Sequence, residues 1–90
     1  MLFCSNDEMS IGVIKYLTTH GFNLPEDMKI VSFDNIEMSK YIKPSLTTVD
    51  INRVDWARCL GNIMITLLEN KEIDYSKFIP KYSIIRRESF

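Results

Sequence analysis

The sequence has no apolar run of the ~20 residues that a membrane-spanning helix requires. No basic segment followed by an apolar core opens the chain, as a secretory leader would. Clustered cations are also scarce. The densest basic run is Arg86-Arg87, and the formal net charge is −1. We therefore expect no membrane contact, and no DNA binding by this segment itself, because phosphate contacts need grouped lysines and arginines.

Catalytic and metal-binding motifs are missing as well. Cys4 and Cys59 have no CxxC neighbour and no histidine at metal-ligand spacing. They are expected to be buried free thiols in a reducing cytoplasm. The chain has no GxSxG elbow, phosphate-binding loop or carboxylate pair beside a nucleophile. The expectation is a cytoplasmic protein that is not an enzyme and has no metal site, no catalytic residues and no cofactor.

The composition is that of a globular protein: 46% of residues are apolar and 26% are charged. Ninety residues make at most one small domain or a piece of a larger one. A chain of this length buries only ~60–65% of its unfolded surface, so it is marginally stable unless it finds a partner.

The stretch Leu2 to Asp7 organises the chain. A short apolar run ends in Ser5, Asn6 and Asp7, which is typical of a central strand, near 2–5, covered on both faces of a parallel sheet. Apolar residues at helical spacing then predict a helix near 8–20. Ser5 and Glu8 fit a capping box for it, and Asn6 or Asp7 could also cap it.

A second strand is predicted near 29–33, followed by Asp34-Asn35. Strand, helix and strand joined by short connections form a parallel βαβ unit, so both polar strand ends share the carboxyl edge where α/β sheets bind ligands. Further along, the pattern predicts a strand near 46–51 and a helix near 53–69. A last strand near 79–85 is broken by Pro80, and residues 86–89 form a polar tail. The predicted class is α/β.

Four stretches, in order, resemble the last part of the effector-binding domain of the lactose-repressor/galactose-repressor (LacI/GalR) family of bacterial transcription regulators. Phe3 to Gly12 is similar to the family's strand, Asp and first helix. Gly21 to Asn35 is similar to its Pro-Glu-Asp turn and next strand. Pro44 to Val49 and Ile84 to Ser89 are similar to its Leu-Thr-Thr-Val and closing Arg-xxx-Ser motifs.

This resemblance implies a fragment of a periplasmic-binding-protein-like fold, a doubly wound parallel sheet in two lobes joined by a hinge. Residues 1–45 and 77–90 would belong to the distal lobe, 46–51 to a hinge crossing, and 52–70 to a helix of the other lobe. Such regulators bind a small effector, a sugar or a nucleobase, between the lobes. They bind DNA through an N-terminal domain that these 90 residues lack, so the chain is expected to be a fragment.

The resemblance also implies that Asp7 binds the effector, and we expect the neighbouring Asn6 and Ser5 to be supporting residues of the cleft wall. A carboxylate at a strand end can accept two sugar hydroxyls, and Asp7→Ala is expected to weaken effector binding without unfolding the lobe. The alternative is that Asp7 only caps the helix. Ser32, where the family commonly has Gly, and Ile51, where several members have Gln, depart from the pattern.

Three functions remain open. The chain is part of a sugar- or small-molecule-responsive regulator, part of a periplasmic transport receptor of the same architecture, or a self-associating module without effector binding. The family resemblance places Met9, Ile11, Tyr41 and Ile42 at a dimer interface. The broad apolar stripe of the second helix also predicts self-association as a homodimer or a swapped oligomer.

Overall fold

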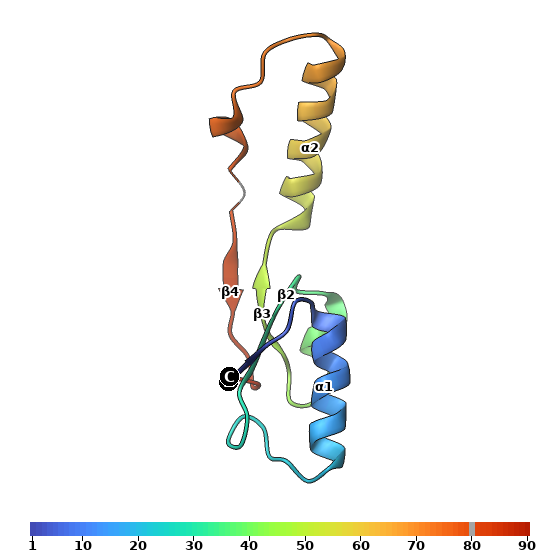
Figure 1. Cartoon of the computed structure of the whole chain (residues 1–90), viewed down its shortest axis with the longest axis vertical. Helices are drawn as coiled ribbons and strands as arrows, with labels where there is room; N and C mark the ends of the chain where they lie inside the picture. The colour runs from blue at the N-terminus through green and yellow to red at the C-terminus, as the bar shows by residue number, and fades with distance from the viewer. Residues whose placement is uncertain (80) are drawn as a thin grey trace. The chain divides into compact units, whose positions relative to one another are not determined.

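The computed structural model of the chain describes residues 1–79 and 81–90. The chain divides into two compact units, residues 1–50 with 83–90 and residues 51–82, and each is described by itself (Figure 1). Pro80, where the sequence predicts a break in the last strand, lies outside the described residues.

The first unit is built on a four-stranded sheet with the strand order β1-β2-β3-β4. β1, β2 and β3 are parallel, and β4 is antiparallel to β3. The predicted α/β class and the parallel βαβ arrangement are therefore confirmed. The bounds are Leu2–Phe3 for β1, Ile30–Phe33 for β2, Thr47–Asp50 for β3 and Ser83–Ile85 for β4.

The prediction that the first strand is central and buried is wrong for this chain. β1 lies at the edge of the sheet, because β2 is its only partner in the part of the chain that the structure describes. Leu2 is 37% exposed and Phe3 is 59% exposed. Only Cys4, just after β1, is buried. An apolar run predicts burial on both faces, but the described residues leave the Leu2 and Phe3 side chains largely uncovered.

The helix after β1, α1, spans Asp7–Thr19, one residue from the prediction. Its N-cap is Asn6, whose side chain accepts a hydrogen bond from the Met9 amide at 2.9 Å. The capping box built on Ser5 is therefore not formed, and Asp7 is the first helical residue rather than the cap. Ile14 of α1 is buried with Cys4, Ile30 and Leu46, and these four residues form the small core.

The C-terminal residues 86–89, predicted as a polar tail, are instead part of the first unit. Ser89 is fully buried. Its backbone carbonyl accepts from the Ile30 amide at 2.8 Å, and its hydroxyl donates to the Ile30 carbonyl at 2.7 Å. The same hydroxyl accepts from the Thr47 amide at 2.8 Å. Ser89 thus joins the first residues of β2 and β3, where the strand pattern alone leaves those groups unpaired.

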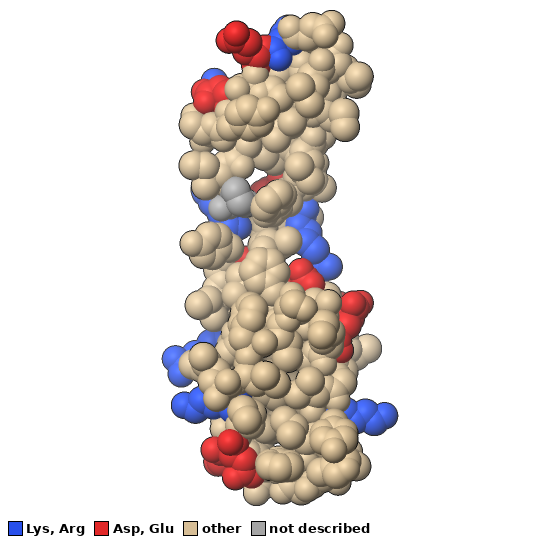
Figure 2. Space-filling view, viewed as in Figure 1, with Lys and Arg blue, Asp and Glu red and all other residues tan. Residues whose placement is uncertain are grey.

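The second unit contains the helix α2, Arg53–Leu68, and a short 3-10 helix η2, Tyr75–Phe78. The predicted helix near 53–69 is confirmed. None of the described residues of this unit is buried, so Cys59, expected to be buried, is only half-buried. Residues 59–68 carry no charge, and the face shown in Figure 2 has few charged side chains over α2. No helix in the described part of the chain is long and apolar enough to cross a membrane.

Candidate functional site

The candidate site lies in the first unit, at the carboxyl ends of β1 and β2, and is centred on Asp7. The Asp7 side chain is fully buried. Its Oδ1 accepts hydrogen bonds from the Thr48 hydroxyl at 2.6 Å and from the Ser32 hydroxyl. Its Oδ2 accepts from the Ile36 amide at 2.9 Å. One carboxylate therefore holds together α1, β2, β3 and the segment after β2.

These contacts use most of the hydrogen-bonding capacity of Asp7. A carboxylate offers about four lone-pair sites, and three are occupied, which leaves one on Oδ2. The sequence predicts Asp7 at the carboxyl edge of the sheet, where ligands bind, but the structure buries its carboxylate inside the first unit. The Asp7→Ala variant would leave three hydrogen-bond donors without their acceptor, so the structure predicts that it destabilises the fold. Direct effector binding by Asp7 stays a prediction.

Ser5 and Asn6 are the predicted site residues with access to solvent. Ser5 is exposed, and its hydroxyl lies 3.2 Å from the Met9 sulfur. Asn6 is half-buried and uses its side-chain oxygen to cap α1. Chain connectivity places both residues directly before Asp7, between the end of β1 and the start of α1.

A second polar cluster, absent from the sequence predictions, surrounds Arg87. Its guanidinium donates to the Asn35 side-chain oxygen at 2.8 Å, to the Ser39 hydroxyl at 2.9 Å and to the Leu46 carbonyl at 2.7 Å. The backbone N–H of Asn35 in turn donates to the Thr48 hydroxyl at 3.2 Å. Asp34 and Asn35 both have positive φ, 109° and 49°, which fits the turn role considered for them. Arg87 is thus linked to Asp7 through Asn35 and Thr48.

Ser32, Thr48 and Arg87 are the residues that sequence reasoning missed in this network. A signal existed for the two hydroxyls, because a polar side chain within an apolar strand must find a partner when buried. The short 3-10 helix η1, Glu37–Lys40, carries Ser39 into the same cluster. Nothing in the local pattern marks Arg87, because its partners lie 41 to 52 residues away.

Electrostatics single out Glu88, next to Arg87. The Ser45 backbone amide donates to its carboxylate at 2.7 Å, the Lys43 ammonium at 2.9 Å and the Ser45 hydroxyl at 2.9 Å. These donors favour the charged form and lower the pKa of Glu88 from 4.5 to about 2. The carboxylate thereby ties the C-terminal segment to the turn before β3.

The four residues predicted at a dimer interface belong to the first unit. Met9 is 57% exposed and Tyr41 is 68% exposed. Ile11 is half-buried, and Ile42 packs partly buried against the core. Among the described residues, no group of three or more His, Cys, Asp or Glu side chains could hold a metal ion.

Parallel strands with polar groups gathered at their carboxyl ends are typical of α/β ligand-binding domains. The chain belongs to the family of periplasmic binding protein-like domains, whose model matches residues 2–90. It is 32% identical over 88 residues to the HTH-type transcriptional repressor PurR of Vibrio cholerae. That match covers 98% of this chain and 26% of the relative, so the chain spans about a quarter of the relative's length.

Solved structures agree with this assignment. A sugar-binding transcriptional regulator of the LacI family from Escherichia coli is 30% identical, with a TM-score of 0.77, over 99% of this chain and 32% of that one. The transcription regulator CcpA of Lactococcus lactis has a TM-score of 0.89 over 97% of this chain and 32% of its own, at 23% identity, which is a likeness of fold alone. The resemblance to the LacI/GalR effector-binding domain is thus confirmed.

Proposed function

We propose that the chain is the effector-binding and dimerisation part of a bacterial transcription regulator that acts in the cytoplasm and responds to a sugar or another small molecule. The observation that carries this proposal is the group of polar residues Ser5 to Asp7 at the end of β1, in a chain whose relatives are named as a transcriptional repressor and a sugar-binding transcriptional regulator. Those names favour binding over catalysis, and regulation over transport. DNA contact would come from a segment outside these 90 residues, because their net charge is −1.

Within this proposal, Ser5, Asn6 and Asp7 are the effector-binding residues, with unequal roles. The exposed Ser5 hydroxyl and the half-buried Asn6 side chain contact the effector directly. Asp7 has one lone-pair site left on Oδ2 and offers a single further hydrogen bond once it is uncovered. The first unit would be the distal lobe, residues 46–51 the hinge crossing and α2 a helix of the other lobe.

The test is calorimetric titration of the 90-residue chain with a panel of D-ribose, D-glucose, D-xylose and the free bases adenine and hypoxanthine. Ser5→Ala removes one hydroxyl, and Asn6→Ser changes the side chain while keeping a good N-cap. Each should weaken binding by roughly 3–10-fold, as expected for one lost hydrogen bond.

Thr19→Ala is the matched control, because the Thr19 hydroxyl only donates to the Lys15 carbonyl within α1. It should bind like the unmodified chain. If Ser5→Ala and Asn6→Ser bind with the affinity of the unmodified chain, the effector does not bind at this edge of the sheet. No saturable binding to any member of the panel would leave self-association as the better proposal.

Self-association is supported by a specific observation on α2. Leu60, Met64, Leu67 and Leu68 follow helical spacing, and each is more than half exposed. An exposed apolar stripe of this kind marks an interaction surface. We include in this proposal the surface formed by Met9, Ile11, Tyr41 and Ile42 in the first unit, and exchange of α2 between two copies.

A further inference from the structure

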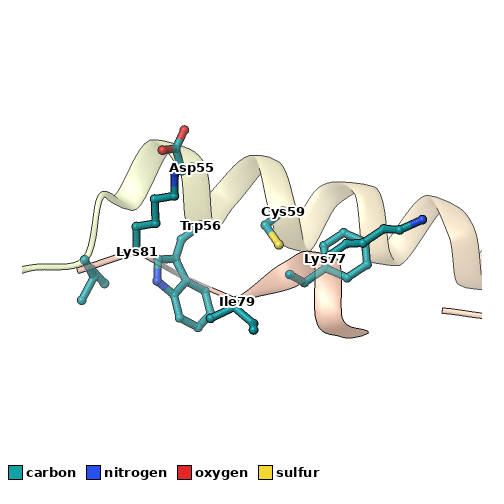
Figure 3. Close-up of a pocket in the computed structure, with 8 residues that line it drawn as sticks. Asp55, Trp56, Cys59, Lys77, Ile79 and Lys81 are labelled. Carbon is teal, nitrogen blue, oxygen red and sulfur yellow. The ribbon is translucent and has the colours of Figure 1, made fainter. Parts of the chain in front are cut away.

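The second unit contains a cavity of about 200 Å³. Trp56 and Cys59 line it from the first turns of α2, and Phe78 and Ile79 line it from η2 and the residue that follows (Figure 3). Every lining residue falls within 51–82, so the cavity belongs to this unit alone. An apolar cavity of ~150 Å³ is large enough for benzene. This one therefore has room for a single substituted ring.

The Trp56 side chain supplies an unused hydrogen-bond donor at this cavity. Its indole Nε1 is buried and has no hydrogen-bond partner in the described part of the chain. A buried N–H without an acceptor costs free energy, and native structures rarely leave one unexplained. An occupant with an acceptor atom would remove that cost, while the indole and Phe78 rings offer apolar faces to a planar group.

The charged residues of the lining favour an anionic acceptor. Lys77 and Lys81 both line the cavity, and Asp55 is the only acid among the lining residues. The Asp55 carboxylate already binds the Arg58 guanidinium at 3.2 Å. Lys77 has one long contact, 3.6 Å to Asp74, with both side chains more than half exposed. The three charged lining residues therefore sum to a net charge of +1, although Figure 3 shows the Lys81 nitrogen beside Asp55 and the Lys77 nitrogen pointing away from Trp56.

We propose that this cavity is a binding site for a small aromatic carboxylate. The ring lies against Trp56 and Phe78, and the carboxylate accepts hydrogen bonds from the indole N–H and from Lys81, whose side chain turns from Asp55 to the bound anion, while Lys77 adds only longer-range attraction. Apolar walls with a few convergent donors are the usual build of a small-molecule site. The site is independent of the effector-binding proposal for Ser5 to Asp7, so either can fail without the other.

The test uses the one tryptophan of the chain as its reporter, because a single indole N–H resonance belongs to Trp56. The isotope-labelled 90-residue chain is titrated with sodium benzoate and followed by proton–nitrogen correlation spectra. We expect a saturable shift of the indole resonance. Benzyl alcohol has the ring without the charge, and acetate the charge without the ring. Each should bind at least about fivefold more weakly than benzoate, having lost one of the two contributions.

Variants test the role of the two lysines. Lys77→Gln combined with Lys81→Gln should weaken benzoate binding by roughly tenfold. Lys71→Gln, a lysine of the same unit outside the cavity and paired with Glu69, should leave it unchanged. A linear, non-saturating shift, or one of equal size with all three probes, would overturn the proposal. Equal benzoate affinities in the double variant and the Lys71→Gln control would also overturn it.

Discussion

Asp7→Ala should destabilise the first unit severely. The fully buried carboxylate accepts hydrogen bonds from Ser32, Thr48 and the Ile36 amide. Each buried donor left without an acceptor costs about 1–3 kcal/mol. The hydroxyls can rotate toward other acceptors but the amide cannot, so we expect a loss of about 3–4 kcal/mol in total. Asp7→Asn keeps one acceptor oxygen and should fall between the unmodified chain and Asp7→Ala.

The assay is the rate at which a thiol reagent labels Cys4, which is buried in the core of the first unit. A Cys59→Ser background removes the second thiol. Labelling then requires opening of the unit, and a loss of 3–4 kcal/mol should raise its rate roughly 10²–10³-fold. Glu8→Gln changes the neighbouring exposed acid in the same turn, and its loss of helix-dipole interaction should raise the rate less than about tenfold. An Asp7→Ala rate within about fivefold of the unmodified rate would refute this reasoning.

Three further predictions follow from other contacts. Glu88 stabilises the fold fully above its ordinary pKa of 4.5, and this contribution is lost as pH falls toward about 2. Glu88→Gln should therefore unfold with a weaker pH dependence across that window in acid titrations followed by circular dichroism. If Glu88→Gln and the unmodified chain respond identically, the proposed linkage is wrong. Arg87→Lys removes guanidinium hydrogen bonds to Asn35, Ser39 and Leu46. It should lower the free energy of opening by about 1.5–3 kcal/mol in the Cys4 assay. Arg86→Lys, at an exposed neighbour, should cost less, and equal effects would argue against the network. Leu60→Glu with Leu67→Glu should shift sedimentation toward monomer at micromolar concentration, whereas Asn62→Glu on the same exposed helix should not.

Much of the fold follows from local patterns. The helices near 8–20 and 53–69 and the strands near 29–33 and 46–51 all match within one or two residues, because periodic apolar residues and flanking breakers specify them. The last strand is shorter than predicted, Ser83–Ile85, because these are the residues that pair with β3. The 3-10 helix η2 is not visible in the sequence pattern, because a turn of four residues has no periodicity to reveal it.

The candidate site was only partly predictable. Ser5, Asn6 and Asp7 are predicted site residues because a polar run after an apolar strand indicates a strand end, and their role in binding stays a prediction. Burial of the Asp7 carboxylate depends on Ser32 and Thr48, which are 25 and 41 residues away in the sequence. The two hydroxyls indicate that a partner is needed when they are buried, but nothing in the local pattern shows that this partner is Asp7. The same holds for Arg87 and Ser89, whose polar character suggested a solvated tail.

The most direct test of the central claim is a map of backbone amide shifts in the 90-residue chain, titrated with whichever sugar or base of the panel binds in calorimetry. The account predicts that the largest shifts fall at Ser5 to Asp7 and at Asp34 to Ile36, the strand ends joined by the Asp7–Ile36 hydrogen bond. Saturable shifts confined to the second unit, or spread evenly over the chain, would contradict it.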